Sequence, residues 1–310
     1  MFKHKDYVLT ILEMGSFTKA SEKLFVSQPS LSATVKRLEE KLGAPLFDRS
    51  NSPIKLTEVG EEYVRQAKEI IKIEQSFSKY LTDRGNLISG KLKIGGSTFF
   101  SSFILPEMVS RFCEKYSSVE LEIFEDTTKN LINKLKDGDL DIIMDNAVID
   151  DEKLSSEVFV RERLVLAVPK EYEINRKLKK YALTAEQIIN DEHVKKESVD
   201  LSKFKKQPFI LLRHENDTGK RAEKMLKKYQ VEPTVAFCID QQITAYNLAC
   251  TGMGISFIGD ELIKKVPPTE RLCYYAINDR LSFREIYFYY KKSGYLTVAL
   301  KKFIEFSVKK

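Results

Sequence analysis

The feature that most constrains this chain is one long stretch of helical periodicity, from about Thr57 to Leu81. No proline or glycine follows Gly60 within it, so no residue there interrupts a helix. The segment Arg84-Gly85-Asn86 then breaks the pattern, and Ser89-Gly90 forms a natural linker. A long helix followed by a linker predicts two separate modules, one before the helix and one after the linker.

The apolar residues of this helix recur with alternating steps of four and three. Such a repeat is typical of a coiled-coil seam, whose period is about 3.5 residues. Most stripes of this kind pack inside their own domain. Because this helix lies between two expected modules, we interpret its stripe as a surface for self-association. The seam consists of Val59, Tyr63, Gln66, Ile70, Ile73, Phe77 and Tyr80.

From Lys91 onward, short apolar segments alternate with amphipathic ones. This alternation predicts an α/β fold with a parallel sheet built from β-α-β units. The expected strands are 92–95, 119–124, 141–144, 164–168, 209–212, 234–239, 255–258, 272–277 and 284–290. The expected helices lie near 102–116, 129–137, 220–229, 242–251 and 298–308.

The first 57 residues predict three short helices and a turn-rich hairpin. Ser16 is placed to cap the second helix, and Ser27 to cap the third. One stripe of apolar residues along the third helix is expected to be buried; it comprises Leu31, Val35, Leu38 and Leu42. The opposite side carries small residues first and basic ones a turn later, namely Pro29, Ala33 and Lys36, flanked by Ser32 and Arg37.

Two interpretations of this helix pair fit its spacing equally well. One is an ordinary αα-hairpin, and the other is a helix-turn-helix whose third helix enters the major groove of DNA. The residues that follow favour the second, because Gly43 caps the helix and Ser50-Asn51-Ser52-Pro53 predicts a turn between two short extended pieces. A hairpin in this position makes a winged module, in which Arg49 and Lys55 are placed to meet phosphate.

Together these segments resemble the LysR-type transcriptional regulators. The resemblance implies a winged helix-turn-helix, a dimerising linker helix and an effector domain folded like a periplasmic binding protein. It further implies binding to double-stranded promoter DNA as a homodimer or tetramer, and a response to a small metabolite. The matching motifs are Phe17-Thr18-Lys19-Ala20, Leu24-Phe25-Val26-Ser27-Gln28-Pro29-Ser30-Leu31-Ser32, Leu38-Glu39-Glu40-Lys41-Leu42-Gly43, Leu46-Phe47-Asp48-Arg49 and Leu56-Thr57-Glu58-Val59-Gly60.

The resemblance covers essentially the whole chain and divides it into three parts. The DNA-binding domain is expected over residues 1–58, the dimerisation helix and hinge over 59–90, and the effector-binding domain over 91–310. Within the last, subdomain I is expected at about 91–162 and 269–310, and subdomain II at about 163–268.

The residues that we expect to contact DNA are Ser27, Gln28, Pro29, Ser32, Lys36, Arg37, Arg49 and Lys55. Two positions depart from the family pattern. Ala33 stands where the family often has an arginine that contacts DNA, and Ser52 stands where the wing often carries a basic residue. These departures leave Gln28, Pro29, Ser32 and Lys36 as the expected contacts to base edges.

A ligand in an open parallel sheet binds beyond the carboxyl ends of the strands, where helices begin and present free N–H groups. Taken singly, each serine or threonine there is more simply a helix cap; their convergence favours a pocket for a polar or anionic effector. Arg213 is either the cationic partner of an acidic effector or part of a surface salt bridge. The expected effector residues are Ser97, Thr98, Phe99, Thr128, Asn146 and Arg213.

Several function classes are disfavoured by composition and spacing. The chain carries a net charge of +6, but residues 1–90 contribute 14 basic and 12 acidic side chains, so bulk charge does not indicate DNA binding. Three scattered histidines and the absence of known catalytic motifs argue against an enzyme. The four cysteines lack metal-ligand spacing and lie in apolar stretches, so we expect no metal and no cofactor. They are expected to be buried thiols, with a redox-sensing pair as the alternative.

The start of the chain shows no basic-then-apolar signal segment, and the longest uncharged run, 241–259, contains several polar residues and glycines. We therefore expect a cytoplasmic protein with no membrane partner. A solute-binding or sensor protein without a DNA-binding role is the alternative, but it leaves residues 1–90 unexplained. The lysine-rich segment 171–206 is interpreted as a solvated insertion, with an extra protein or DNA contact as its alternative.

Overall fold

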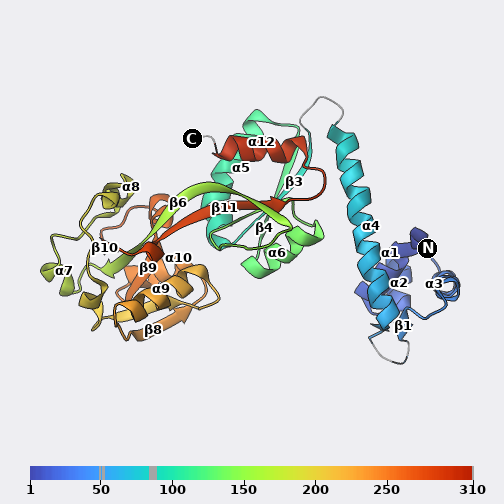
Figure 1. Ribbon diagram of the computed structural model, residues 1–310, viewed down its shortest axis with the longest axis horizontal. Coiled ribbons are helices and arrows are strands. Elements are labelled where there is room, and N and C mark those ends of the chain that lie inside the picture. The colour runs from blue at the N-terminus through green and yellow to red at the C-terminus, as the bar shows by residue number, and fades with distance from the viewer. Residues whose placement is uncertain (49, 51–52, 84–88, 309–310) are drawn as a thin grey trace. The chain divides into compact units, whose positions relative to one another are not determined.

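The structure is a computed structural model that describes residues 1–48, 50, 53–83 and 89–308. The chain forms two compact units, Met1–Leu81 and Thr82–Lys310 (Figure 1). No helix in the described part of the chain combines the length and the apolar character needed to cross a membrane.

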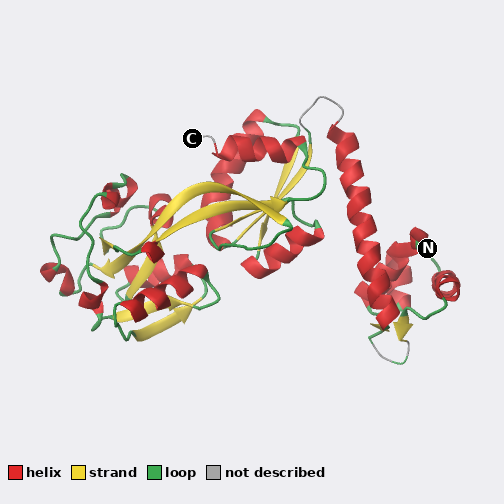
Figure 2. Cartoon of the chain, viewed as in Figure 1, coloured by secondary structure: helices red, strands yellow, loops and turns green. Residues whose placement is uncertain are grey.

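The first unit is helical with a small hairpin (Figure 2). Its elements are the 3₁₀ turn η1 (Phe2–His4), α1 (Lys5–Met14), α2 (Phe17–Lys23), α3 (Gln28–Leu42), β1 (Phe47–Asp48), β2 (Lys55–Leu56) and α4 (Glu58–Asp83), whose last two residues lie beyond the unit. Both expected caps are confirmed, since the Ser16 hydroxyl oxygen accepts the Lys19 N–H and the Ser27 oxygen accepts the Ser30 N–H. The strands β1 and β2 pair antiparallel, as the predicted wing requires.

Each of the helices α1, α2, α3 and α4 buries one face in the core of the first unit. Leu31, Val35 and Leu38 of α3 are buried there, as the sequence pattern predicts. Tyr63 of α4 is also buried in this core, where its ring stacks on Phe2 with centroids 4.8 Å apart. The expectation that the α4 seam is exposed from Val59 onward is therefore wrong at Tyr63.

The second unit is built on a mixed sheet in two lobes, with strand order β4-β3-β5-β11-β6-β9-β7-β8 and with β10 also paired to β6. Parallel pairs join β3 to β4 and β5, and β7 to β8 and β9, while β6, β10 and β11 pair antiparallel. The strands are β3 (Gly90–Gly96), β4 (Val119–Glu125), β5 (Ile142–Asp145), β6 (Leu154–Pro169), β7 (Pro208–Leu212), β8 (Thr234–Ile239), β9 (Ile255–Gly259), β10 (Leu272–Ala276) and β11 (Phe283–Lys291).

The strand β6 connects the lobes, and the chain returns to the first lobe where β11 begins. β6 runs beside β11 from Leu154 to Arg163 and then beside β9 and β10 from Leu164 to Pro169, so its middle marks the crossing (Figure 1). We call residues 90–163 and 283–308 the first lobe and residues 164–282 the second lobe. β10 thus lies in the second lobe, although the sequence groups its residues with subdomain I.

Helices cover the sheet in both lobes. The first lobe carries the short π-helix η2 (Phe100–Ile104), α5 (Leu105–Lys115), α6 (Thr128–Asp137) and α12 (Val298–Val308). The second lobe carries α7 (Ile174–Lys177), α8 (Ala185–Ile189), η3 (Glu192–Val194), η4 (Leu201–Phe204), α9 (Asp217–Lys228), α10 (Gln242–Cys250), α11 (Asp260–Lys265) and η5 (Arg280–Ser282).

Two sequence expectations fail in the second lobe. The segment 171–206 is not a solvated insertion, because its apolar residues are buried in the core; among them are Leu183, Ile188, Leu201 and Phe204. Its lysines project from short turns that pack on β10. Cys238 is exposed on the edge strand β8, so the expectation of a buried thiol is wrong for this residue.

Candidate functional site

One face of α3 is exposed to solvent along the helix. Ser27, Gln28 and Pro29 are exposed, and about two turns later Lys36 and Arg37 are exposed on the same helix. Ser32 is half-buried between them, and Ala33 is exposed. This surface follows from the buried stripe of α3, since packing Leu31, Val35 and Leu38 inward leaves the opposite face outward.

The hairpin of the first unit supplies one more expected contact. Lys55 is exposed at the start of β2 and lies opposite Asp48 of β1. Arg49 and Ser52, on which the sequence analysis also relies, lie outside the described residues. The surface that can be described is therefore α3 together with Lys55.

The second unit contains a cavity of about 470 Å³ between its two lobes. Its walls come from the carboxyl ends of strands and the first turns of α6, α9 and α10. A volume of this size suits a small metabolite. The polar lining residues include Ser97, Thr128, Asp145 and Asn146 from the first lobe, and Asn216, Asp217, Thr218 and Gln242 from the second.

Four of the six expected effector residues line this cavity: Ser97, Phe99, Thr128 and Asn146. Thr98 does not, because its hydroxyl donates to Glu125 at 2.6 Å instead. Arg213 is also absent from the lining, and its Nε lies 3.0 Å from Asp240 Oδ1 in an exposed salt bridge. Arg213 therefore forms a surface salt bridge, which was one of the two interpretations of this residue from the sequence.

Asp145 is a cavity residue that the sequence analysis did not single out as a site. Its carboxylate accepts the Thr128 hydroxyl at 2.7 Å and the Ala147 N–H at 2.8 Å. Burial raises the pKa of Asp145, and these two hydrogen bonds oppose that shift. The only sequence signal was its position at the end of a strand.

A buried arginine connects the cavity to the crossing strand. Arg284 Nε lies 2.5 Å from Glu162 Oε2, in the middle of β6, while Nη1 lies 3.0 Å from Asp217 Oδ2 and donates to Thr218 Oγ1 at 2.8 Å. Arg284 Nη2 donates to Gln242 Oε1 at 3.4 Å. Burial raises the pKa of Glu162 to about 7, and the charge of Arg284 opposes this. The sequence analysis did not predict this network, because its residues lie far apart in the chain and form no local motif.

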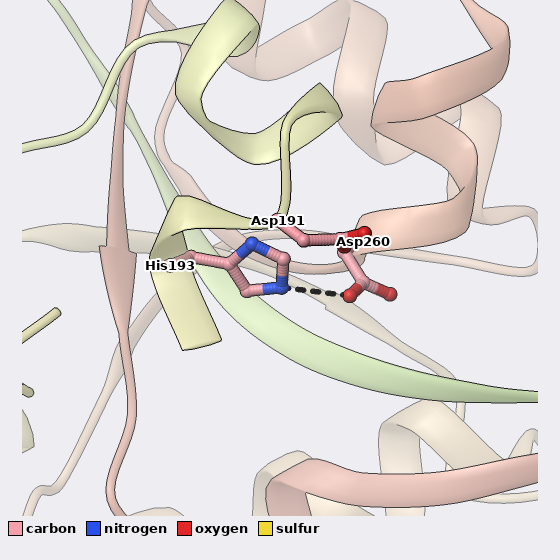
Figure 3. A group of neighbouring side chains, drawn as sticks. All are labelled: Asp191, His193 and Asp260. Carbon is pink, nitrogen blue, oxygen red and sulfur yellow. Dashed lines mark hydrogen bonds and ion pairs between the residues drawn. The ribbon is translucent and has the colours of Figure 1, made fainter. Parts of the chain in front are cut away.

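A second buried group lies beside the same crossing (Figure 3). His193 Nε2 is 2.8 Å from Asp260 Oδ2, and Asp260 Oδ1 accepts the Arg163 N–H at 2.9 Å. Asp191 lies close enough that one atom from each of the three side chains falls within 4.8 Å of the others, as in a metal site. However, the Lys264 ammonium lies 2.8 Å from Asp191, so a positive charge is already supplied by the chain. We interpret the group as a structural one, whose hydrogen bonds hold α11, η3 and β6 together.

Comparison with known proteins gives matches over both units. The family model described as "LysR substrate binding domain" matches residues 85–310. The model described as "Bacterial regulatory helix-turn-helix protein, lysR family" matches residues 2–61. The HTH-type transcriptional regulator YcgK of Bacillus subtilis (strain 168), itself uncharacterized, is 28% identical over 305 residues, which cover 98% of this chain and 93% of that protein.

Solved structures show the same fold. A full-length OxyR from Pseudomonas aeruginosa aligns with a TM-score of 0.66 at 21% identity, over 99% of this chain and 96% of that one. Full-length CbnR in complex with its target DNA aligns with a TM-score of 0.63 at 17% identity, over 99% and 98% of the two chains. With both family models matched in order along the chain, this protein belongs to the LysR family of transcriptional regulators, with a helix-turn-helix DNA-binding domain and an effector-binding domain.

Proposed function

We propose that α3 reads promoter DNA by placing its amino-terminal end in the major groove. The observation that carries this proposal is the exposed run Ser27, Gln28 and Pro29 at the start of a helix whose opposite face is buried. Gln28 has the side-chain amide that pairs with adenine. The hydroxyl of Ser32 can donate a hydrogen bond to a base edge or accept one from it. The sugar-phosphate backbone is then contacted by Ser27, Lys36, Arg37, Arg49 and Lys55. Lys36 also reaches base edges.

Replacing Lys36 with alanine tests this placement. We expect weaker binding to all duplexes and a salt dependence reduced by about one phosphate contact, because one counterion fewer is released. The measurement is fluorescence anisotropy of labelled duplex DNA across a salt series. Lys41→Ala, in the last turn of the same helix, is the matched control and should leave the slope unchanged. An unchanged slope in Lys36→Ala would remove this residue from the interface.

We propose that the protein self-associates through the distal part of α4. Ile73 is 69% exposed and Phe77 is 59% exposed, and Tyr80 is exposed on the same stripe. A helix that leaves such a row of large apolar side chains in water is stabilised by a partner helix. The partner we propose is the same helix of a second copy, in a dimer or a tetramer built from dimers.

We propose that the cavity between the lobes binds a small effector with at least one anionic group. Lys129 in the first turn of α6 and Lys220 in the first turn of α9 both line it. Neither ammonium has a carboxylate partner among the described residues, and each adds positive charge at the amino-terminal end of its helix. The carboxylate of Asp217 is already paired with Arg221 and Arg284.

Removing the Ser97 hydroxyl should weaken effector binding about tenfold, since Ser97 lines the cavity and its hydroxyl holds no hydrogen bond within the described chain. Carboxylates and phosphate esters are first screened with the wild-type protein for ligands that raise its melting temperature. Ser97→Ala is then titrated with each ligand found. Ser102→Ala, an exposed neighbour outside the cavity, is the control. Equal affinity of Ser97→Ala and wild type would place the ligand elsewhere.

The proposed effector acts by favouring one arrangement of the lobes over another, because a ligand that binds both equally shifts nothing. In this account the protein carries out no reaction of its own. Its proposed place of action is the cytoplasm, where promoter DNA and metabolites meet.

A further inference from the structure

The turn between α2 and α3 contains a residue in an unfavourable backbone conformation. Phe25 has a φ of 54°, in the left-handed region. The Phe25 N–H donates to the Glu22 carbonyl at 3.2 Å, and the Val26 N–H donates to the Ser21 carbonyl at 3.0 Å. These two hydrogen bonds define a Schellman motif, whose left-handed position is normally glycine because a Cβ clashes with the backbone there.

The same motif recurs in this chain with other residues at the left-handed position. Gly43, Gly138 and Gly252 each occupy it, with the same pair of hydrogen bonds back into the preceding helix. Gln230 occupies it after α9, where its N–H donates to Lys227 and the Val231 N–H donates to Leu226. Three of the five motifs found in the described residues thus use glycine, and one uses a polar side chain suited to water. Phe25 is the exception.

Among the described residues, no packing of the Phe25 ring offsets the strain of its backbone. Its side chain is 96% exposed, so the ring is not held by the core of the first unit. An aromatic ring in water and a Cβ in a left-handed backbone both oppose phenylalanine at this position. Phe25 lies two residues before Ser27, the cap of α3, and is exposed, as are Ser27, Gln28 and Pro29.

We propose that Phe25 is a DNA-contacting residue. Its ring packs against apolar parts of the duplex next to the α3 entry point, a deoxyribose or a thymine methyl group. The Schellman turn fixes the backbone of Phe25 before binding, so little backbone conformational entropy is lost on contact. This inference rests on the proposed placement of α3, and the experiment separates the two.

The experiment compares Phe25→Asn and Phe25→Gly with the wild-type full-length protein. Both replacements suit the left-handed region, so we expect each to unfold about 4 °C higher than wild type in a thermal melt. The DNA probe is a duplex selected from random sequences by the wild-type protein. We expect affinity for it to fall about tenfold in both variants, and Phe25→Tyr to keep affinity within about twofold.

Gln230→Gly is the matched control, because it relieves the same strain in the second unit. It should not change the affinity for DNA. Wild-type affinity in Phe25→Asn and Phe25→Gly, together with a lost affinity in Lys36→Ala, would overturn the Phe25 inference alone. Wild-type affinity in all three variants would overturn the proposed DNA surface as well.

Discussion

Replacing Arg284 with methionine is expected to lower the free energy of unfolding by about 3–5 kcal/mol, the cost of breaking a buried ion pair. Arg284 is 5% exposed and holds Glu162 on one side and Asp217 on the other. Methionine fills a similar volume but leaves the Glu162 carboxylate buried without a counter-charge. Urea unfolding of the full-length protein, followed by circular dichroism, measures the change.

Two further variants make this result specific to the buried network. Arg280→Met removes an exposed guanidinium from the neighbouring η5 and should change stability by less than about 0.5 kcal/mol. The double variant Glu162→Gln with Arg284→Met should recover part of the loss, because it removes the orphaned charge together with its partner. A loss below about 1 kcal/mol in Arg284→Met would show that the network does not hold the lobes' crossing.

The same network predicts a pH dependence. Burial raises the pKa of Glu162 to about 7 from an ordinary value of 4.5, and Arg284 opposes this. A carboxyl whose folded pKa is raised contributes stability that is present below the ordinary pKa and is lost as the pH rises through about 7. Removing Arg284 raises the folded pKa further. The destabilisation by Arg284→Met is therefore expected to be larger at about pH 8 than at about pH 5.

Replacing Ile73 with lysine is expected to weaken self-association at least about 100-fold, because a charge would be buried in the seam between two α4 helices. Ile73 is the most exposed of the large apolar residues on α4, so the folded monomer should tolerate the change. Analytical ultracentrifugation measures the oligomer, and the same samples are tested for binding to a selected duplex. We expect monomers with much weaker DNA binding, since a monomer can engage one half-site only.

Gln75→Lys is the matched control for Ile73→Lys. It adds the same charge two residues along, on an exposed position off the seam, and should leave the oligomer intact. If Ile73→Lys sediments at the same size as Gln75→Lys and wild type, α4 is not the contact between copies.

Local rules explain why much of the first unit is predictable from sequence. Ser16, Ser27 and Gly43 act on neighbouring backbone groups, and a buried stripe leaves only one face of α3 for solvent. Tyr63 shows the limit of such reasoning. Its spacing fits the seam of α4, yet the ring packs on Phe2, because the 3₁₀ turn at the start of the chain folds back to it.

The second unit is less predictable because its site is assembled from distant segments. Glu162 and Arg284 are 122 residues apart, and only the pairing of β6 with β11 brings them together. The first half of β6 places the polar run Ser155-Ser156-Glu157 before the apolar run Val158-Phe159-Val160, without the alternation or the continuous apolar character that predicts a strand. Ser97 and Thr98 are adjacent in one strand-to-helix turn, and sequence cannot tell which hydroxyl faces the cavity and which bonds to Glu125.

The central claim, that α3 reads DNA sequence through its exposed amino-terminal end, is tested most directly by the discrimination of Gln28→Ala. The measurement is the affinity of full-length wild type and variant for a duplex selected by the wild type and for a random duplex at the same salt concentration. We predict that the difference in binding free energy between the two duplexes falls by about 1–3 kcal/mol in the variant, the contribution of one bidentate base contact. A ratio unchanged in Gln28→Ala, and unchanged again in Ser32→Ala, would contradict this placement of α3.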